Sequence, residues 1–286
     1  MKKQKKIDYE IYCLYHNKIN KEYYGNQINK LTFVKLDCSE YVFPAKKQIV
    51  LLNETFSQIG KEWAEYEFYY YLYKKHKKGE IKLPEYLGFI QYDMEFKSKQ
   101  IGHKDESIID FIEKLINENK LNPKTMILFN PEPFMKMWKQ NIIMAPKRPD
   151  LKNDSSFENC FETIIKEYNF LEKKNIQLSD LKNKNLAMCG AFLVHKSVFI
   201  KLMDFLSIII ESKKLEIYDK TNRMQGNFAE RYAAIFLEAM NLNKIEFPVV
   251  HYFSKTLEMP LHKKIIWRIN KNIGKLGILI RKLYAH

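Results

Sequence analysis

Hydrophobic and polar positions follow two different periods along the chain, and the two periods predict strands and helices in alternation. Short runs of aromatic and β-branched residues bounded by polar residues are typical of strands. Apolar residues three and four positions apart are typical of helices. We expect strands at residues 8–16, 31–37, 86–93, 125–130 and 244–253, with a short one near Gly190 that leads into a helix. We expect further helices at 59–79, 107–120, 157–174 and 226–242.

This alternation indicates an α/β fold, in which helices cover both faces of a sheet. Asn227 is the expected N-cap of the helix at 226–242. The near-continuous apolar character of YLGFIQYD, residues 86–93, is typical of a central, buried strand. Residues 131–156 contain several prolines and predict a long loop or an insertion.

The C-terminal end has a pattern of its own. From residue 261 onward, isoleucine and leucine recur three and four positions apart, Lys and Arg lie between them, and there is no acid. A basic amphipathic helix of this kind fits an anchor on an anionic membrane surface. The alternative is a helix packed on the domain with a solvated lysine face. Trp267 and the absence of acids favour the membrane interpretation.

Composition changes this picture little. The formal charge of +14 comes from 48 Lys and Arg against 34 Asp and Glu, and much of the excess lies at the two ends. No helix-turn-helix, zinc-finger or RNP-type pattern accompanies it, so nucleic acid is not the expected partner. Four cysteines without a CxxC pair, and no secretory signal or span of about 18 apolar residues, indicate reduced thiols in a cytoplasmic protein.

Two carboxylates follow the strand-like segment. Asp93 and Glu95 are two positions apart, so on a regular strand both would face one side and could reach one ion. Open α/β sheets bind ligands at the carboxyl ends of their strands. Two oxygen ligands with vacant positions suit Mg²⁺ or Mn²⁺, whose remaining shell is often filled by phosphates. The alternative is an ordinary solvated strand end.

Several segments together resemble the GT-A-fold glycosyltransferases, and more closely the capsular-polysaccharide and lipooligosaccharide glycosyltransferases. The resemblance rests on AEYEFYYYLYKKH followed by YLGFIQYDMEF, then AMCGAFLVHKSVFIKLMDFL, NFAERYAAIFLEAM and PVVHYF, in that order. It covers roughly residues 8 to 256. It implies a GT-A-like, Rossmann-like mixed sheet flanked by helices as a catalytic domain over residues 1–256, followed by the basic tail at 257–286.

The resemblance assigns roles to five residues. Asp93 and Glu95 match the motif that holds a metal and the donor diphosphate, with Glu95 where a second Asp is commoner. Gly190 matches a glycine of an acceptor-side loop. Glu230 matches an acid that acts as general base or contacts the acceptor. His251 matches a late histidine that touches the metal or the diphosphate, although a structural histidine is the alternative.

Four other residues are candidates from their positions. Tyr15 and His16 end the first strand, where they could contact the donor, although a loop histidine explains His16 nearly as well. Glu65 lies on an otherwise apolar helix face, and either points into the site or is exposed. Arg231 could bind diphosphate through two nitrogens or pair with Glu230.

These expectations define a leading function and two rivals. The leading one is transfer of a sugar from a nucleotide-diphosphate donor to a hydroxyl of a glycan or lipid-linked glycan, assisted by Mn²⁺ or Mg²⁺, at the inner face of the cell membrane. The first rival is a phosphotransferase or nucleotidyltransferase that uses the same carboxylates. The second is a membrane-associated scaffold without catalysis.

Overall fold

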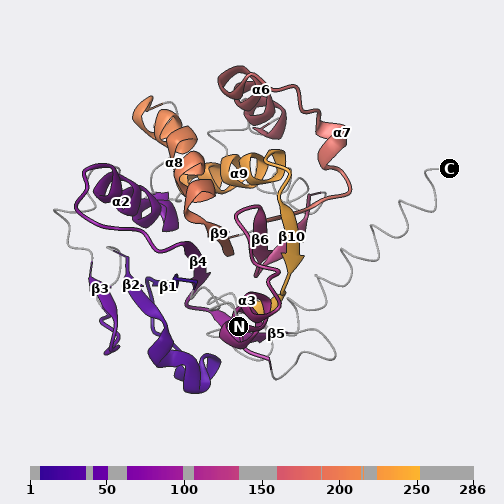
Figure 1. The fold of residues 1–286 in the computed structure, drawn as a ribbon. Coiled ribbons are helices and arrows are strands. Elements are labelled where there is room, and N and C mark those ends of the chain that lie inside the picture. The colour runs from indigo at the N-terminus through magenta and orange to yellow at the C-terminus, as the bar shows by residue number, and fades with distance from the viewer. Residues whose placement is uncertain are drawn as a thin grey trace, which may run out of the picture. The chain divides into compact units, whose positions relative to one another are not determined.

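The fold is that of a computed structural model, which describes residues 7–36, 41–50, 63–98, 106–134, 160–187, 189–213, 215 and 224–251. The chain divides into two compact units, residues 1–250 and 251–286. The architecture below is that of the first unit (Figure 1). The basic tail predicted at 261–286 lies outside the described residues.

A mixed sheet of seven strands forms the centre of the first unit, in the order β10-β6-β9-β4-β1-β2-β3. Strands β3, β2, β1 and β4 run parallel to one another, β10 runs parallel to β6, and β9 lies antiparallel between β4 and β6. The strands are β1 Tyr9–Tyr15, β2 Thr32–Lys35, β3 Gln48–Val50, β4 Tyr86–Gln91, β6 Thr125–Leu128, β9 Phe192–His195 and β10 Asn243–Glu246. This sheet confirms the expected α/β class.

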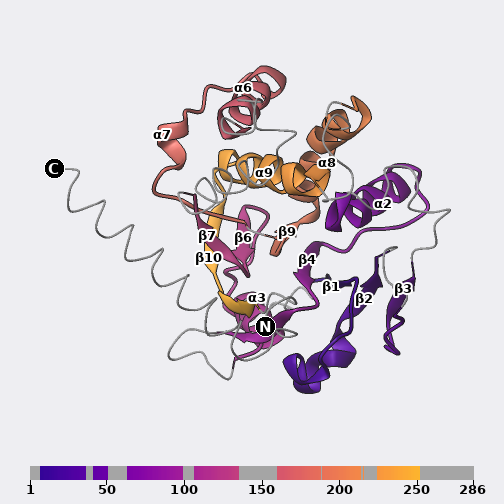
Figure 2. The same ribbon diagram turned by 180° about the vertical axis from the view of Figure 1, so that it is seen from behind.

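Helices cover both faces of the sheet, as the sequence predicts (Figures 1 and 2). Helices α2 (Glu65–Lys77), α8 (Lys196–Glu211) and α9 (Met224–Ala239) lie on one face, and α6 (Cys160–Glu172) and α7 (Leu178–Leu181) belong to the same layer. The opposite face carries α3 (Ile108–Asn117) and the 3₁₀ helices η1 (Lys21–Tyr23) and η2 (Gly25–Lys30).

The alternation of side chains in β4 divides the core into two clusters. Leu87 and Phe89 pack under α2 and α8, whereas Tyr86 and Ile90 pack with the α3 layer. Successive strand residues point to opposite faces, so a strand buried on both sides must be apolar throughout. Burial on both faces of the sheet therefore explains the apolar run that predicts a central strand.

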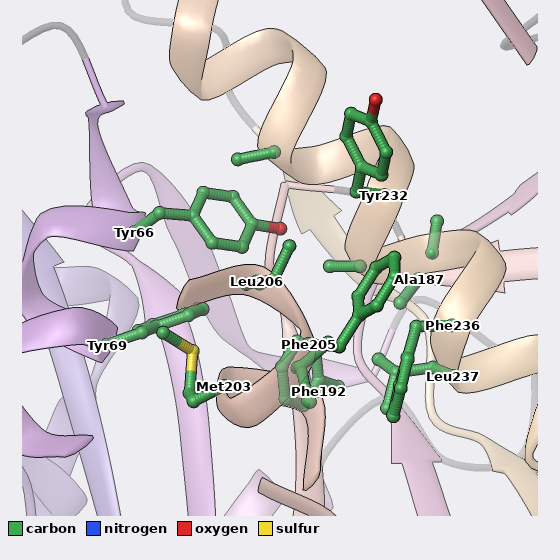
Figure 3. Packing of buried hydrophobic residues seen from close by; sticks show 14 of the residues in the cluster. Tyr66, Tyr69, Ala187, Phe192, Met203, Phe205, Leu206, Tyr232, Phe236 and Leu237 are labelled. Carbon is green, nitrogen blue, oxygen red and sulfur yellow. The ribbon is translucent and has the colours of Figure 1, made fainter. Parts of the chain in front are cut away.

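Aromatic side chains dominate the cluster under α2, α8 and α9. Figure 3 shows Tyr66 and Tyr69 of α2 facing side chains of α8 and α9. Ring centroids lie 5.2 Å apart for Phe205 and Phe236, and 4.2 Å apart for Tyr69 and Phe89. Full burial of one such ring stabilises the fold by about 1.5–3 kcal/mol, so this cluster joins the three helices firmly to the sheet.

Two small two-stranded sheets complete the unit. Strand β7 (Pro131–Pro133) pairs antiparallel with β8 (Asn185–Ala187), and β5 (Met94–Ser98) pairs with β11 (Val249–His251). The start of the region expected to be irregular, 131–156, is therefore a short strand, and residues 135–156 lie outside the described residues. A proline-rich strand is possible here because the pairing is confined to a two-stranded edge.

Two expected boundaries are wrong. The final strand, expected to run through 244–253, is split into β10 and β11 at Phe247 and Pro248, and proline has no N–H to continue a ladder. Asn227 is not an N-cap, because α9 already begins at Met224. Gly226 lets this first turn lie against α2, since a Cβ there would come within 3.0 Å of the Ala64 Cβ.

Along the part of the chain described here, no helix is both long enough and apolar enough to cross a bilayer.

Candidate functional site

The carboxyl edge of the parallel strands collects most of the predicted site residues. Strand β9 runs antiparallel to β4 and β6, and Phe192 at its start is in register with Phe89 and Leu128. The residues just before β9 therefore lie beside the residues just after β4 and β6. This register brings Gly190 to the same edge as Asp93.

The residues Cys189 and Gly190, called here the Cys189–Gly190 turn, are held by three hydrogen bonds from side chains. Gln91 Nε2 donates to the Cys189 carbonyl at 2.9 Å, and the Tyr69 hydroxyl donates to the Gly190 carbonyl at 2.7 Å. The Cys189 backbone N–H donates to Glu230 Oε1. The turn therefore connects β4, α2 and α9 at one point.

Position 190 has room only for glycine. Its φ of +60° lies in the left-handed region, and a Cβ there would come within 2.5 Å of the Tyr69 hydroxyl and 3.2 Å of Glu65 Cγ. Cys189 is also left-handed, with φ of +56°. A non-glycine residue in this region is uncommon and is often found at functional sites. The acceptor-side role of Gly190 stays a prediction.

Three buried carboxylates lie within electrostatic range of the turn. Glu65, Asp93 and Glu230 are only 8%, 6% and 7% exposed. Burial raises the pKa of the Cys189 thiol, and the negative charges of these three carboxylates raise it further. Burial also raises the pKa of the Tyr69 hydroxyl, with further contributions from Glu65, Cys189 and Glu230. Acids from three separate segments thus lie within electrostatic range of one thiol. Glu65 is buried, which agrees with the interpretation that it points inward and not with the one that it is exposed.

Asp93 and Glu95 do not stand on one regular strand. Strand β4 ends at Gln91, Asp93 lies in the tight turn that follows, and Glu95 lies on β5. The alternation argument for a shared side therefore does not apply here. Both carboxylates nevertheless act on one group: burial raises the pKa of Tyr23, and the charges of Glu95 and Asp93 raise it further.

The turn that carries Asp93 is held from the α3 face of the sheet. The Tyr24 hydroxyl donates to the Tyr92 carbonyl at 2.8 Å and lies 3.3 Å from Cys13 Sγ. The His16 ring packs edge-on against Tyr92, with centroids 4.9 Å apart. His16 is therefore at the same edge as Asp93, as expected for a residue that ends the first strand.

Arg231 pairs inside the protein. It is 4% exposed, its Nη1 donates to the Asn227 carbonyl at 2.5 Å, and the same nitrogen lies 3.7 Å from Glu230 Oε2. The sequence allows Arg231 either to bind a diphosphate or to pair with Glu230, and the structure shows the pairing with Glu230.

Tyr15 is held in the core of the first unit, and His251 ends a strand. The Tyr15 hydroxyl accepts a hydrogen bond from the Phe43 backbone N–H at 3.1 Å and one from Gln48 Nε2 at 2.9 Å, which fixes Tyr15 in the core. His251 ends β11 and is the first residue of the second unit. Its contact with a metal or a diphosphate stays a prediction.

A metal ion can be tested against the donors that are present. Within residues 7–251, gaps excepted, no group of three or more His, Cys, Asp and Glu is arranged to hold an ion. Mg²⁺ and Mn²⁺ need fewer, since one or two carboxylates together with water and substrate phosphates suffice. Asp93 and Glu95 supply carboxylate oxygens of that kind, and a metal ion held by them stays a prediction.

Sequence reasoning missed the groups that hold the turn. Tyr69, Gln91 and Cys189 make the hydrogen bonds described above. The Asn130 side chain makes a hydrogen bond with the Cys189 thiol, which lowers the pKa of that thiol, whereas burial and the three carboxylates raise it. Tyr69 could have been found, because it follows Glu65 by four residues and so shares its helix face. The N–H that binds Glu230 belongs to the backbone of Cys189, so the identity of that residue does not indicate the bond.

Comparisons with known proteins give a structural likeness. No protein-family model matches the chain, and no curated protein matches it. The chain is similar to the apo structure of the bifunctional glycosyltransferase WbbM, with a TM-score of 0.46 and 14% identity over 84% of this chain. It spans 45% of that protein's length, less than half.

Proposed function

We propose that the chain is a glycosyltransferase that moves a sugar from a nucleotide-diphosphate donor to a hydroxyl of a surface-glycan acceptor. The observation that carries this proposal is the gathering of Glu65, Asp93 and Glu230 around the Cys189–Gly190 turn, at the carboxyl edge of β4. Carboxylates accept hydrogen bonds from sugar hydroxyls, and this edge is where open α/β sheets bind ligands. The motif order that resembles the capsular-polysaccharide glycosyltransferases points the same way.

The donor diphosphate would lie near the turn between β4 and β5. Asp93 and Glu95 would hold a divalent ion there, and the ion would neutralise the charge of the diphosphate leaving group. Asp93 is fixed by the Tyr24 bond to the neighbouring Tyr92 carbonyl, which limits the movement of its backbone. His16 lies against Tyr92 and so could contact the nucleotide.

Glu230 is the candidate general base. Its Oε1 accepts the Cys189 N–H, and its Oε2 faces Arg231 at 3.7 Å, so both oxygens are oriented by the protein. In an inverting reaction Glu230 would take the proton of the acceptor hydroxyl as the hydroxyl oxygen attacks the anomeric carbon. In a retaining reaction it would orient the sugar. Glu65, whose Cγ lies 3.2 Å from the position that a Cβ on Gly190 would take, would accept bonds from sugar hydroxyls.

One binding experiment separates this proposal from its rivals. Thermal unfolding of the full chain is measured with UDP, GDP, CDP and TDP, and with the corresponding triphosphates, each with and without Mn²⁺. We expect one nucleotide with Mn²⁺ to raise Tm by about 5–10 °C at about 100 times its Kd. Asp93→Asn should abolish this rise, and Glu118→Gln, which changes an exposed carboxylate paired with Lys120, should preserve it.

Each other outcome contradicts the proposal in a recognisable way. Stabilisation by nucleoside triphosphates alone would favour a phosphotransferase or nucleotidyltransferase. No response to any nucleotide would favour a scaffold. A response that survives Asp93→Asn would place the nucleotide away from the turn between β4 and β5.

A further inference from the structure

The Cys189–Gly190 turn is the point where three elements meet, and its backbone groups are bonded to all three. Tyr69 comes from α2, Gln91 ends β4, and Glu230 comes from α9. A fourth bond, from the Phe129 N–H to the Ala191 carbonyl at 3.1 Å, joins the turn to the end of β6. The conformation of the turn therefore decides where the Cys189 N–H points, and so where Glu230 is bound.

This conformation is unfavourable for the residues alone. Cys189 has a side chain and yet adopts a φ of +56°, which L-residues other than glycine rarely do. Such a residue persists only where its surroundings hold it. Gln91 binds the Cys189 carbonyl and Tyr69 binds the Gly190 carbonyl, so the two side chains hold two successive peptide groups of the turn.

The Tyr69 hydroxyl is fixed by the packing of its ring. Tyr69 is fully buried, and its ring lies 5.0 Å from the Tyr66 ring and 4.2 Å from the Phe89 ring, centroid to centroid. Figure 3 shows it beside Met203, between α2 and α8. The ring therefore cannot turn away without disturbing the core, and its hydroxyl donates from one direction only.

We propose that Tyr69 and Gln91 are positioning residues, which hold the Cys189–Gly190 turn in its left-handed form and thereby aim the Cys189 N–H at Glu230. The inference rests on the proposed function for its catalytic consequence, because an oriented Glu230 is what the transfer needs. The two hydrogen bonds from Tyr69 and Gln91 to the turn, called here the clamp, exist whether or not the chain is a glycosyltransferase. When either bond is lost, the turn relaxes toward negative φ, the Cys189 N–H leaves Glu230, and Cys189, which is already partly exposed, becomes more accessible.

The same helix supplies matched controls. Tyr73 donates its hydroxyl to Asp204 at 2.6 Å, and Tyr70 donates to Glu211 at 2.7 Å, both away from the turn. Tyr69→Phe, Tyr70→Phe and Tyr73→Phe therefore each remove one hydroxyl and one hydrogen bond from α2. Only Tyr69→Phe removes a bond to the turn. Gln91→Leu is the second test variant, since it removes the bond to the Cys189 carbonyl.

The first readout is the rate of alkylation of each cysteine by iodoacetamide, followed by mass spectrometry of the peptides from the native full chain. We expect Tyr69→Phe and Gln91→Leu to raise the rate at Cys189 about tenfold or more over wild type, because thiol reactivity follows exposure. Tyr70→Phe and Tyr73→Phe should leave it within about twofold. Cys13 is fully buried and reports global opening in the same samples.

Two results would overturn the clamp. One is a Cys189 rate in both test variants that matches the rate in Tyr73→Phe. The other is a rise at Cys189 that is matched by an equal rise at Cys13, because that would show general unfolding.

The second readout is steady-state transfer kinetics with the donor identified by the binding experiment. We expect Tyr69→Phe to lower kcat about tenfold with KM for the donor nearly unchanged, because a misplaced Glu230 affects the transition state more than donor binding. An unchanged kcat, or a loss confined to KM, would contradict the positioning role. If wild type transfers no sugar, the proposed function fails, and the alkylation rates still decide whether the clamp exists.

Discussion

Tyrosine hydroxyls make the polar contacts that matter most around the candidate site. Tyr24 reaches the Tyr92 carbonyl from one face of the sheet, and Tyr69 reaches the Gly190 carbonyl from the other. Each bond holds the backbone beside an acid of the site. Buried hydroxyls of this kind stabilise chiefly because an unmade bond would leave a buried carbonyl unsatisfied, at a cost of about 1–3 kcal/mol.

Gly190 gives a prediction at the scale of one residue. Gly190→Ala places a Cβ at φ +60° and within 2.5 Å of the Tyr69 hydroxyl, so it combines backbone strain with a clash. We expect the free energy of unfolding to fall by about 2–5 kcal/mol. Urea unfolding of the purified variant measures this value.

Gly79 supplies the control for that experiment. It also has a left-handed φ, of +72°, but nothing lies within 4 Å of the position that a Cβ would take. Gly79→Ala should therefore cost only the backbone term, about 1–2 kcal/mol. Equal losses in the two variants would show that the Tyr69 hydroxyl does not crowd position 190.

At the scale of elements, the helices were predicted well from the sequence. The apolar periods at 107–120 and 157–174 correspond to α3 and α6, whose ends lie within a few residues of the prediction. Ser107 caps α3 and receives the Asp110 N–H at 3.1 Å. A helix that covers a sheet must present one apolar face, so its period survives in the sequence.

The turns of the site were predicted less well, for a physical reason. Strand β4 was expected to reach Asp93 but ends at Gln91, because apolar residues continue into a turn that is itself buried. Glu65, Asp93, Gly190 and Glu230 were all named from the sequence, and the structure brings them to one edge. Cys189 acts through its backbone N–H and carbonyl, which nearly every residue type offers, so periodicity cannot reveal it. Gln91 donates its side-chain amide to that carbonyl, and the sequence does not show which backbone group such a side chain will reach.

Helix α6 gives a prediction at the element scale. Tyr168 joins α6 to α8 and α9 through Phe205 and Phe236, and burial, followed by the charge of Glu172, raises its pKa from 10.0 to about 12. As the pH rises, the Tyr168 hydroxyl therefore loses its proton at a lower pH in the unfolded state than in the folded state. Stability from Tyr168 is complete below about pH 10 and is lost as the pH rises toward 12.

Urea unfolding at a series of pH values tests this dependence. Tyr168→Phe removes the titrating group, so its free energy of unfolding should fall less steeply between about pH 10 and 12 than that of wild type. At neutral pH the two proteins should keep a constant difference. Identical slopes in the alkaline range would contradict the assignment.

At the scale of the whole molecule, the basic tail gives a prediction that is independent of the site. Residues 261–286 lie outside the described residues, and their pattern predicts an amphipathic helix on an anionic surface. The full chain should sediment with vesicles that contain phosphatidylglycerol, and a chain without residues 261–286 should not. Each Lys or Arg near such a surface contributes about 1 kcal/mol, so salt should weaken the binding.

Neutral phosphatidylcholine vesicles provide the matched lipid control. Binding of the full chain to them should be much weaker, because the electrostatic part is lost. If the shortened chain still binds anionic vesicles, the tail is not the anchor. In that case its interpretation as a helix packed on the domain gains support.

The central claim is that the buried acids around the Cys189–Gly190 turn receive a nucleotide sugar. A crystal structure of the full chain with Mn²⁺ and the nucleotide sugar selected by thermal unfolding tests it most directly. We predict that the diphosphate and the ion lie beside Asp93, and that the sugar lies between Glu65 and Glu230. A ligand bound elsewhere, with these three carboxylates remote from it, would contradict the account.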